Sequence, residues 1–185
     1  MQIIDLRAED QDVVEQAAEL LVVGFRDHAP AAWPDMTAAL EEVQEACAAG
    51  KIARVALDLA GKAVGWIGGN SRYGGNVWEL HPLVVHPAHQ RQGIGRALVI
   101  DLEALVRARG GLTITLGTDD EANMTSLSGR DLYPNVLEQA IAIRNLRGHP
   151  YEFYQQLGYV ITGVLPDANG FGRPDIFMSK RVANG

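Results

Sequence analysis

The stretch WELHPLVVHPAHQRQGIG, residues 78 to 95, constrains the fold of this chain more than any other. Its apolar, β-branched first half predicts a strand over residues 77 to 85. Pro82 has no N–H to give to a neighbouring strand, so the strand must carry a bulge or lie at a sheet edge there. The second half is a basic, glycine-rich turn that leads into an amphipathic helix. The chain must therefore fold around a broken strand that runs straight into a helix.

Hydrophobic periodicity and turn residues predict the remaining elements. A short hairpin joins two apolar strands across Ala60-Gly61-Lys62, and a single helix crosses over to the strand that follows Gly110-Gly111. This pattern favours one domain over residues 1–185 of the α+β (mixed α/β) class, with a mostly antiparallel sheet flanked by helices. Helices are expected at residues 10–25, 37–49, 136–146 and 150–157, with a further helix from just after Gly95 to Gly110. Strands are expected at residues 52–59, 63–69, 77–85, 112–116, 159–165 and 175–181.

Charge and cysteine content narrow the function classes. The formal net charge is −7 and the acidic residues are spread along the chain, which argues against a nucleic-acid partner and allows a cationic ligand. The single cysteine, Cys47, excludes a disulfide within the chain and is expected as a buried thiol in a helix. The N-terminal residues lack the pattern of a leader peptide and no segment is long enough to span a membrane. We expect a cytoplasmic protein that binds no membrane.

The turn after the strand is a candidate phosphate site. Glycines let the backbone approach a ligand closely, and the N–H groups at a helix N-terminus beside Arg91 and Arg96 suit a diphosphate. A nucleotide P-loop and the dinucleotide fingerprint both require glycine spacings that are absent here. On the glycines alone, an ordinary helix-start turn is an equally good interpretation.

The run Val84-Val85-His86-Pro87, followed by Gln90-x-x-Gly93-x-Gly95, resembles the acetyl-CoA signature of the GNAT superfamily of N-acetyltransferases. The predicted order of elements also resembles the GNAT fold, whose central strands splay apart. The resemblance implies acetyl-CoA as the cosubstrate and no metal. It also implies that Leu83, Val84 and Val85 line the pantetheine arm, and that the pyrophosphate is held by Gln90, Arg91, Gln92, Gly93, Ile94, Gly95 and Arg96.

Further segments resemble one GNAT branch, the aminoglycoside 6'-N-acetyltransferases. These are residues 78–85, 116–120, 125–128, 149–154, 163–170 and 174–176, and the match is looser before residue 64. The resemblance implies acetylation of an aminoglycoside 6'-amine, antibiotic resistance and a homodimer. Two alternatives stay open: a GNAT enzyme for another amine, such as a polyamine or a peptide, and a non-catalytic CoA-binding sensor.

Three residues are candidates for the chemistry, because amide formation needs a proton acceptor for the amine and a donor for the thiolate. Glu79 is the candidate base or amine anchor, with a surface carboxylate as the alternative. Tyr154 is the candidate acid, with an ordinary core tyrosine as the alternative. His81 shares a strand face with Glu79 and is a candidate second base or hydrogen-bonding support, or else a structural histidine.

Besides Glu79, four residues are candidates for binding the acceptor. Asp119 and Asp120 follow a predicted strand, and acids at a strand exit concentrate positive ligands, although they also suit a solvated turn. Asp119 is the preferred member of the pair, since the resemblance implies substrate contacts there. Trp33 and Tyr73 are aromatic residues in loops that can cover sugar rings or simply pack on the core. The histidines have no metal-ligand spacing, so no metal site is expected.

Overall fold

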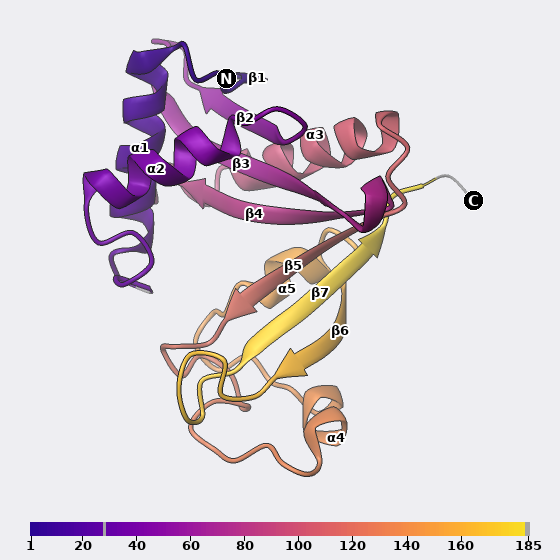
Figure 1. The fold of residues 1–185 in the computed structure, drawn as a ribbon. Helices are drawn as coiled ribbons and strands as arrows, with labels where there is room; N and C mark the ends of the chain where they lie inside the picture. The colour runs from indigo at the N-terminus through magenta and orange to yellow at the C-terminus, as the bar shows by residue number, and fades with distance from the viewer. Residues whose placement is uncertain (28, 184–185) are drawn as a thin grey trace. The chain divides into compact units, whose positions relative to one another are not determined.

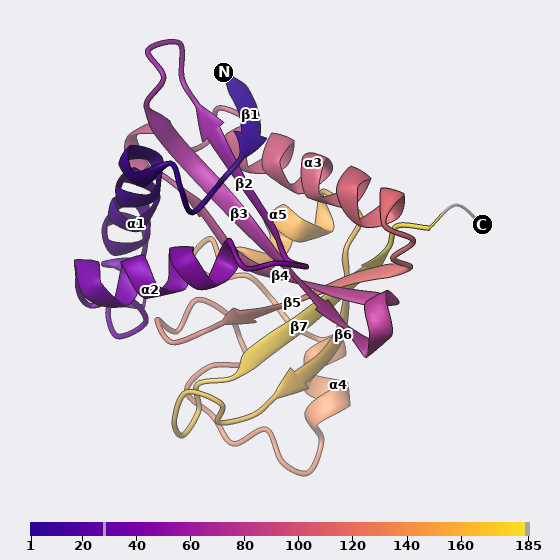
Figure 2. The ribbon, with the colours of Figure 1, turned by 45° about the horizontal axis from the view of Figure 1, so that its top comes forward.

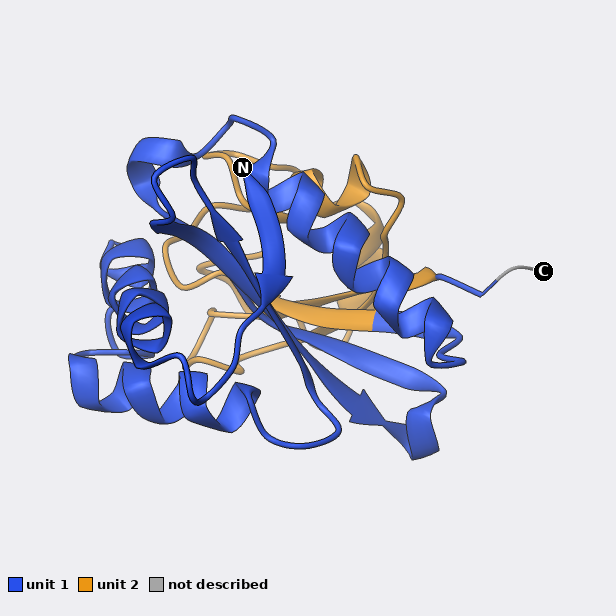
Figure 3. Cartoon of the chain, turned by 90° about the horizontal axis from the view of Figure 1, so that it is seen from above, with its two compact units in different colours: residues 1–114, 182–185 blue, residues 115–181 orange. Residues whose placement is uncertain are grey.

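The computed structural model describes residues 1–27 and 29–183, and the chain divides into two compact units. Unit 1 comprises Met1–Ile114 with the residues from Val182 on, and unit 2 comprises Thr115–Arg181 (Figure 3). Each unit mixes strands and helices, and Figure 1 labels them. That residues 1–185 form a single domain stays a prediction.

Unit 1 is a four-stranded antiparallel sheet covered on both faces. Its strands are β1 (Gln2–Asp5), β2 (Ile52–Leu57), β3 (Ala63–Arg72) and β4 (Val77–Val85), and each pairs with the next. Helices α1 (Gln11–Phe25) and α2 (Met36–Ala46) cover one face and α3 (Ile94–Ala108) covers the other (Figure 2). Residues 63–69 of β3 are all buried, as expected for a central strand with helices on both sides.

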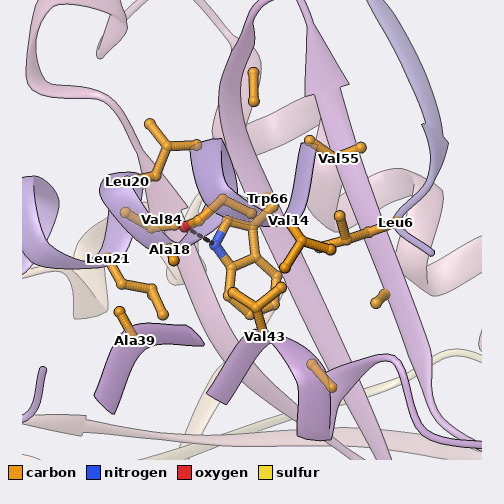
Figure 4. Packing of buried hydrophobic residues seen from close by; sticks show 14 residues of the cluster. Leu6, Val14, Ala18, Leu20, Leu21, Ala39, Val43, Val55, Trp66 and Val84 are labelled. Atoms are coloured by element: carbon orange, nitrogen blue, oxygen red, sulfur yellow. Dashed lines mark hydrogen bonds between the residues drawn. The ribbon is translucent and has the colours of Figure 1, made fainter. Parts of the chain in front are cut away.

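Trp66 is the centre of the core between the sheet and helices α1 and α2. Its side chain has no exposed surface, and its indole N–H donates to the carbonyl oxygen of Ala17 at 3.0 Å (Figure 4). Burying an indole requires such a partner, because an unpaired N–H in an apolar core costs about 1–3 kcal/mol. Val84 of β4 pairs with Trp66 and belongs to the same cluster. The core therefore anchors β4, the strand that carries the candidate site.

Unit 2 contains most of β5 (Thr113–Asp119), together with β6 (Val160–Leu165) and β7 (Asp175–Arg181). β7 lies between β5 and β6 and is antiparallel to β6. Two short helices, α4 (Val136–Ile141) and α5 (Tyr151–Gln155), pack on β6 and β7 respectively. The strand order within the two units is thus β1-β2-β3-β4 and β5-β7-β6.

The predicted fold class is confirmed, and the differences are local. The sequence missed β1, which pairs residue by residue with β2. Helix α2 is capped by Asp35, whose side chain accepts from the N–H of Ala38, and not by Thr37. Helix α4 ends at Ile141, five residues earlier than predicted. Cys47 is only half-buried, and its thiol donates to the carbonyl of Leu6.

Within residues 1–27 and 29–183, no helix is long and apolar enough to cross a membrane.

Candidate active site

Strand β4 carries a bulge at Pro82, as the sequence predicts. Ile67 of β3 pairs with Leu83, and Gly69 pairs with Leu80, so His81 and Pro82 together stand opposite Gly68 alone. A proline fits here because the bulged position does not need to donate to the ladder. The bulge separates residues 83–85 of β4, which are predicted to line the cofactor, from an upstream half that carries Glu79.

Glu79 forms an ion pair that the sequence did not reveal. Arg72, at the end of β3, donates from Nη2 at 2.6 Å and from Nε at 3.1 Å to the same oxygen, Oε2. Both side chains are partly exposed, Arg72 at 55% and Glu79 at 36%. Glu79 pairs with Asn70 in the ladder and Arg72 with Val77, which makes the ion pair a diagonal contact on one sheet face.

His81 does not act as a support for Glu79 in this structure. Its Nε2 lies 3.8 Å from Oε1 of Glu42 on α2, and its ring centroid is 6.0 Å from that of Trp33. Among the hydrogen bonds of the described residues, none joins His81 to Glu79. The nearer partner of His81 in this structure is thus a carboxylate from α2, and its roles as second base or hydrogen-bonding support stay predictions.

Helix α2 adds acidic side chains to this side of the sheet. The hydrogen bond and the charge of Lys51 lower the pKa of Glu45, and the charges of His81 and Arg72 contribute smaller effects in the same direction. Glu45 thus lies within electrostatic reach of His81 and Arg72. Glu42 and Glu45 were not predicted as site residues, because several glutamates in one helix are typical of a solvated surface.

Trp33 and Tyr73 differ in their surroundings. The ring of Trp33 packs edge-on against Phe25 with centroids 4.6 Å apart, and the side chain is part of the apolar cluster beneath α1 and α2. Tyr73 is 82% exposed in the short 3₁₀ turn η1 (Tyr73–Gly75), directly after Arg72. Packing against the core therefore explains most of the position of the Trp33 side chain, whereas the side chain of Tyr73 is exposed and free to contact a ligand.

The glycine-rich turn has the geometry of an anion cradle. Gly93 adopts the left-handed conformation with φ +84°, and a Cβ atom there would meet nothing within 4 Å. Helix α3 begins at Ile94, and the first N–H groups of a 15-residue helix have no partner within the helix. Gln90 and Gln92 brace the turn by donating to the carbonyls of Val85 and Ala88. Arg91, Gln92 and Arg96 are exposed around it.

These features fit a diphosphate, since oriented backbone N–H groups and the positive end of the helix dipole face an open approach. All of them belong to unit 1, as do residues 83–85 of β4. The predicted pyrophosphate residues, 90–96, are thus brought together in one turn, preceded by the short 3₁₀ turn η2 (Pro87–His89).

In unit 2, the two predicted aspartates have different environments. The Oδ1 atom of Asp119 accepts from the side-chain amide of Asn169 at 2.5 Å, and the carboxylate lies at the exposed end of β5. Asp120 is completely buried, and its two oxygens accept from the backbone N–H groups of Met124 and Thr125. Both carboxylate oxygens of Asp120 are thus used to fold the loop that follows, and its substrate-binding role stays a prediction.

Tyr154 lies in α5 with only 8% of its surface exposed. Burial raises its pKa well above the usual value for a phenol, so the hydroxyl keeps its proton across the physiological range. The ring stacks edge-on with Phe153 and Tyr159. Its position is that of a core residue, and the protonation state is the one that an acid requires.

His149 connects the end of β5 to the start of α5. Its Nδ1 accepts from the N–H of Tyr151, so the proton is on Nε2, which donates to the carbonyl of Asp119 at 3.1 Å. Burial is the main influence on this side chain and lowers its pKa, which keeps the imidazole neutral. His149 therefore holds two segments of unit 2 together. The described residues contain no group of three or more His, Cys, Asp or Glu side chains that could hold a metal ion.

Residues 15–133 match the model of the acetyltransferase (GNAT) family. The chain belongs to this family. The predicted resemblance is thereby confirmed, and the mixed sheet described above is that of a GNAT acetyltransferase.

Solved GNAT structures extend the comparison over the full length. A crystal structure of an aminoglycoside 6'-N-acetyltransferase complexed with coenzyme A is 42% identical, with a TM-score of 0.91. The aminoglycoside 6'-N-acetyltransferase from Enterococcus faecium is also 42% identical, with a TM-score of 0.90. An aminoglycoside 6'-acetyltransferase type Ii is 36% identical, with a TM-score of 0.77. Each comparison covers 100% of this chain and 99% of the other. A comparison with curated proteins gave no match.

Proposed function

We propose that this GNAT acetyltransferase transfers the acetyl group of acetyl-CoA to the 6'-amine of aminoglycosides. The observation that carries the proposal is the 42% identity, over the whole chain, to a 6'-N-acetyltransferase whose structure contains coenzyme A. The net charge of −7 also suits a polycationic acceptor.

Residues of unit 1 would hold the cosubstrate. The turn at 90–96 offers backbone N–H groups and two arginines to the pyrophosphate, and Leu83 to Val85 offer the edge of β4 to the pantetheine arm. Acetyl-CoA supplies an activated acetyl thioester. The protein's own task is then to place the amine, remove its protons and protonate the leaving sulfur.

We assign the proton acceptor to Glu79. The acceptor ammonium gives one proton to Oε1 of this carboxylate, either directly or through a water molecule. The neutral nitrogen then forms the new N–C bond while the C–S bond breaks, and the bonding electron pair leaves with the sulfur. The nitrogen loses its second proton to solvent as the amide forms.

We assign the proton donor to Tyr154. Its hydroxyl donates a hydrogen bond to the departing sulfur and passes the proton as negative charge builds up there, and solvent returns a proton to the phenol. Because burial raises the pKa of Tyr154, the phenol still carries its proton when the C–S bond begins to break, and it stabilises the developing thiolate through that hydrogen bond. Such an acid does not lose its proton prematurely.

Acceptor recognition is assigned to exposed acidic and aromatic groups. Asp119 would pair with an ammonium group of the acceptor, and Tyr73 would cover a sugar ring. Trp33, His81 and Glu42 lie close to one another and would line one side of the acceptor site. Asp120 is left out because it is buried. The second candidate function is acetylation of another amine, which the same acidic residues would also attract, and the third is CoA binding without catalysis.

A matched pair of acceptors tests the proposal. Neomycin carries an amine at 6' where paromomycin carries a hydroxyl, so purified protein with acetyl-CoA should release free CoA thiol with neomycin and none with paromomycin. Release with a polyamine or peptide amine alone would establish the second function. Binding of acetyl-CoA without release under any acceptor would establish the third.

We further propose a homodimer that works in the cytoplasm, as the family resemblance implies. Support for self-association comes from apolar side chains on unit 2 that are exposed in the single chain, among them Leu137 and Ile141 of α4 and Val160 of β6. Such exposed apolar groups are typical of interfaces. Light scattering should give twice the chain mass of 20.0 kDa, and a single-chain mass would contradict the dimer.

A further inference from the structure

The guanidinium of Arg72 holds one oxygen of Glu79 and leaves the other free. Two N–H groups, Nε and Nη2, converge on Oε2 at 3.1 and 2.6 Å. Among the hydrogen bonds of the described residues, none reaches Oε1. The carboxylate is thus fixed through one oxygen, while its second oxygen remains able to accept a proton.

The register of the sheet brings the two side chains together. Arg72 and Glu79 lie on adjacent antiparallel strands, displaced by one diagonal, with their side chains on the same face. Hydrogen bonds between a cation and an anion are shorter and about twice as strong as those between neutral groups. Both N–H groups belong to one planar guanidinium, so a rigid group makes the two contacts on Oε2 together, whereas a lysine ammonium would approach as a single point charge.

Other charged groups on this face are engaged elsewhere. Glu45 is paired with Lys51 at 2.9 Å, and His81 faces Glu42. Arginine side chains do not exchange protons as acids or bases in proteins. The influence of Arg72 on the reaction must therefore act through the placement of Glu79.

We propose that Arg72 is a positioning residue for acetyl transfer, which presents Oε1 of Glu79 to the acceptor amine by holding Oε2. The inference rests on the proposed role of Glu79 and adds a residue that the sequence did not indicate. Proton transfer depends steeply on the distance and direction between donor and acceptor. Loss of the clamp lets the carboxylate rotate away from the line of transfer, so the reaction slows even when the acceptor is bound.

Steady-state kinetics of Arg72→Gln and Arg72→Lys test the clamp. We expect Arg72→Gln to lower kcat by about tenfold while the KM for acetyl-CoA stays within about twofold, because the cofactor turn is untouched. Arg72→Lys keeps the charge and one contact, so it should recover part of the loss. Arg7→Gln is the matched control, since Arg7 is an exposed arginine whose nearest carboxylate, that of Asp5, is 3.9 Å away. It should behave like the wild type.

A double-mutant cycle with Glu79→Gln separates positioning from a general structural effect. If Arg72 acts through Glu79, Arg72→Gln should cause little further loss in the Glu79→Gln background. An equal loss in both backgrounds would overturn the proposal. So would a gain in kcat/KM for Arg72→Gln, because it would make Arg72 a competitor of the acceptor cation.

The acceptor preference of the wild-type protein separates the proposed function from the proposed role of Arg72. If it acetylates a different amine and not aminoglycosides, the acceptor assignment fails, and the same cycle run with that amine still decides the role of Arg72. If aminoglycosides are acetylated and the cycle is additive, the clamp fails while the proposed function stands.

Discussion

A Cβ atom on Gly68 would lie 2.2 Å from the carbonyl oxygen of His81, so β3 has no room for a side chain opposite the bulge. Gly68→Ala must push the bulge out of place. We expect the free energy of unfolding to fall by about 1–3 kcal/mol, as for other overpacked sites, and acetylation to be largely lost. Urea unfolding and the rate of CoA release measure the two effects.

Gly163→Ala is the control for this substitution. Gly163 also lies in a strand, β6, but its nearest contact for an added Cβ is Phe177 at 3.9 Å, which is ordinary van der Waals distance. Stability and activity should change little. A Gly68→Ala protein as stable as Gly163→Ala would mean that the bulge is not rigid.

The proposed cofactor role of the turn at residues 90–96 can be tested at Gly93. Alanine there has space but must adopt a left-handed conformation, which costs about 1–2 kcal/mol. Gly50→Ala carries the same backbone cost, since Gly50 has φ +87° and no neighbours within 4 Å, but it lies outside the turn. Both variants should lose similar stability, while only Gly93→Ala should raise the KM for acetyl-CoA. Equal KM values would refute a cofactor role for the turn.

Tyr154→Phe removes the proposed proton donor and keeps the ring in place. We expect kcat to fall by about 10²-fold, within the usual range for a general acid. Since burial raises the pKa of Tyr154, the wild-type rate should show no decline from phenol ionisation up to about pH 10. Tyr159→Phe, a second buried tyrosine of unit 2, serves as the control and should keep the wild-type kcat. A full rate for Tyr154→Phe would remove it from the mechanism.

Asn169 fixes the carboxylate of Asp119 and can be tested with a polycationic acceptor. Asn169→Ala should raise the KM for neomycin about three- to tenfold by releasing Asp119, and Asp119→Asn should also weaken the dependence of KM on salt. Asn135→Ala is the control, because Asn135 is exposed and makes no side-chain cap to α4. Unchanged kinetics for both Asp119→Asn and Asn169→Ala would place the acceptor elsewhere.

His149 predicts how stability depends on pH. Burial lowers its pKa below the value of 6.5 expected in the unfolded chain, so the unfolded state binds the extra proton more readily. The contribution of this residue is complete above pH 6.5 and is lost as the pH falls from there toward the folded-state pKa. Thermal unfolding between pH 8 and pH 5 should show this decline, and it should be smaller in His149→Gln than in His89→Gln. The same slope in both variants would contradict it.

The sequence predicted those structural elements of the candidate site that local chemistry defines. Proline, glycine and a charged residue inside an apolar strand marked β4, its bulge and Glu79, and a helix-start pattern marked the turn before α3. Each of these signals is local. The bounds of β4 therefore agree with the prediction at both ends.

Contacts that depend on register were not predictable. Arg72 looked like part of a loop, and its pairing with Glu79 requires knowing that two residues of β4 oppose Gly68. The sequence offers no way to distinguish Asp120 from its neighbour Asp119. Only the fold shows that the loop after β5 covers Asp120 and donates to its carboxylate. Strand β1 was missed because it is short and no turn signal marks it in the sequence. It is held in the sheet by its pairing with β2.

The bulge in β4 also changes the parity of the strand. Val84 packs with Trp66 beneath α1 and α2, and strict alternation from there would place Glu79 on the opposite face, where Gly69 approaches Leu102 of α3. The extra residue reverses this and leaves Glu79 beside Asn70, on the side of α2. Anyone who grafts this carboxylate onto another sheet, or aligns distant relatives by their two-residue repeat, must count through the bulge. A regular strand of the same sequence, without the bulge, would point the Glu79 carboxylate toward α3 and away from α2.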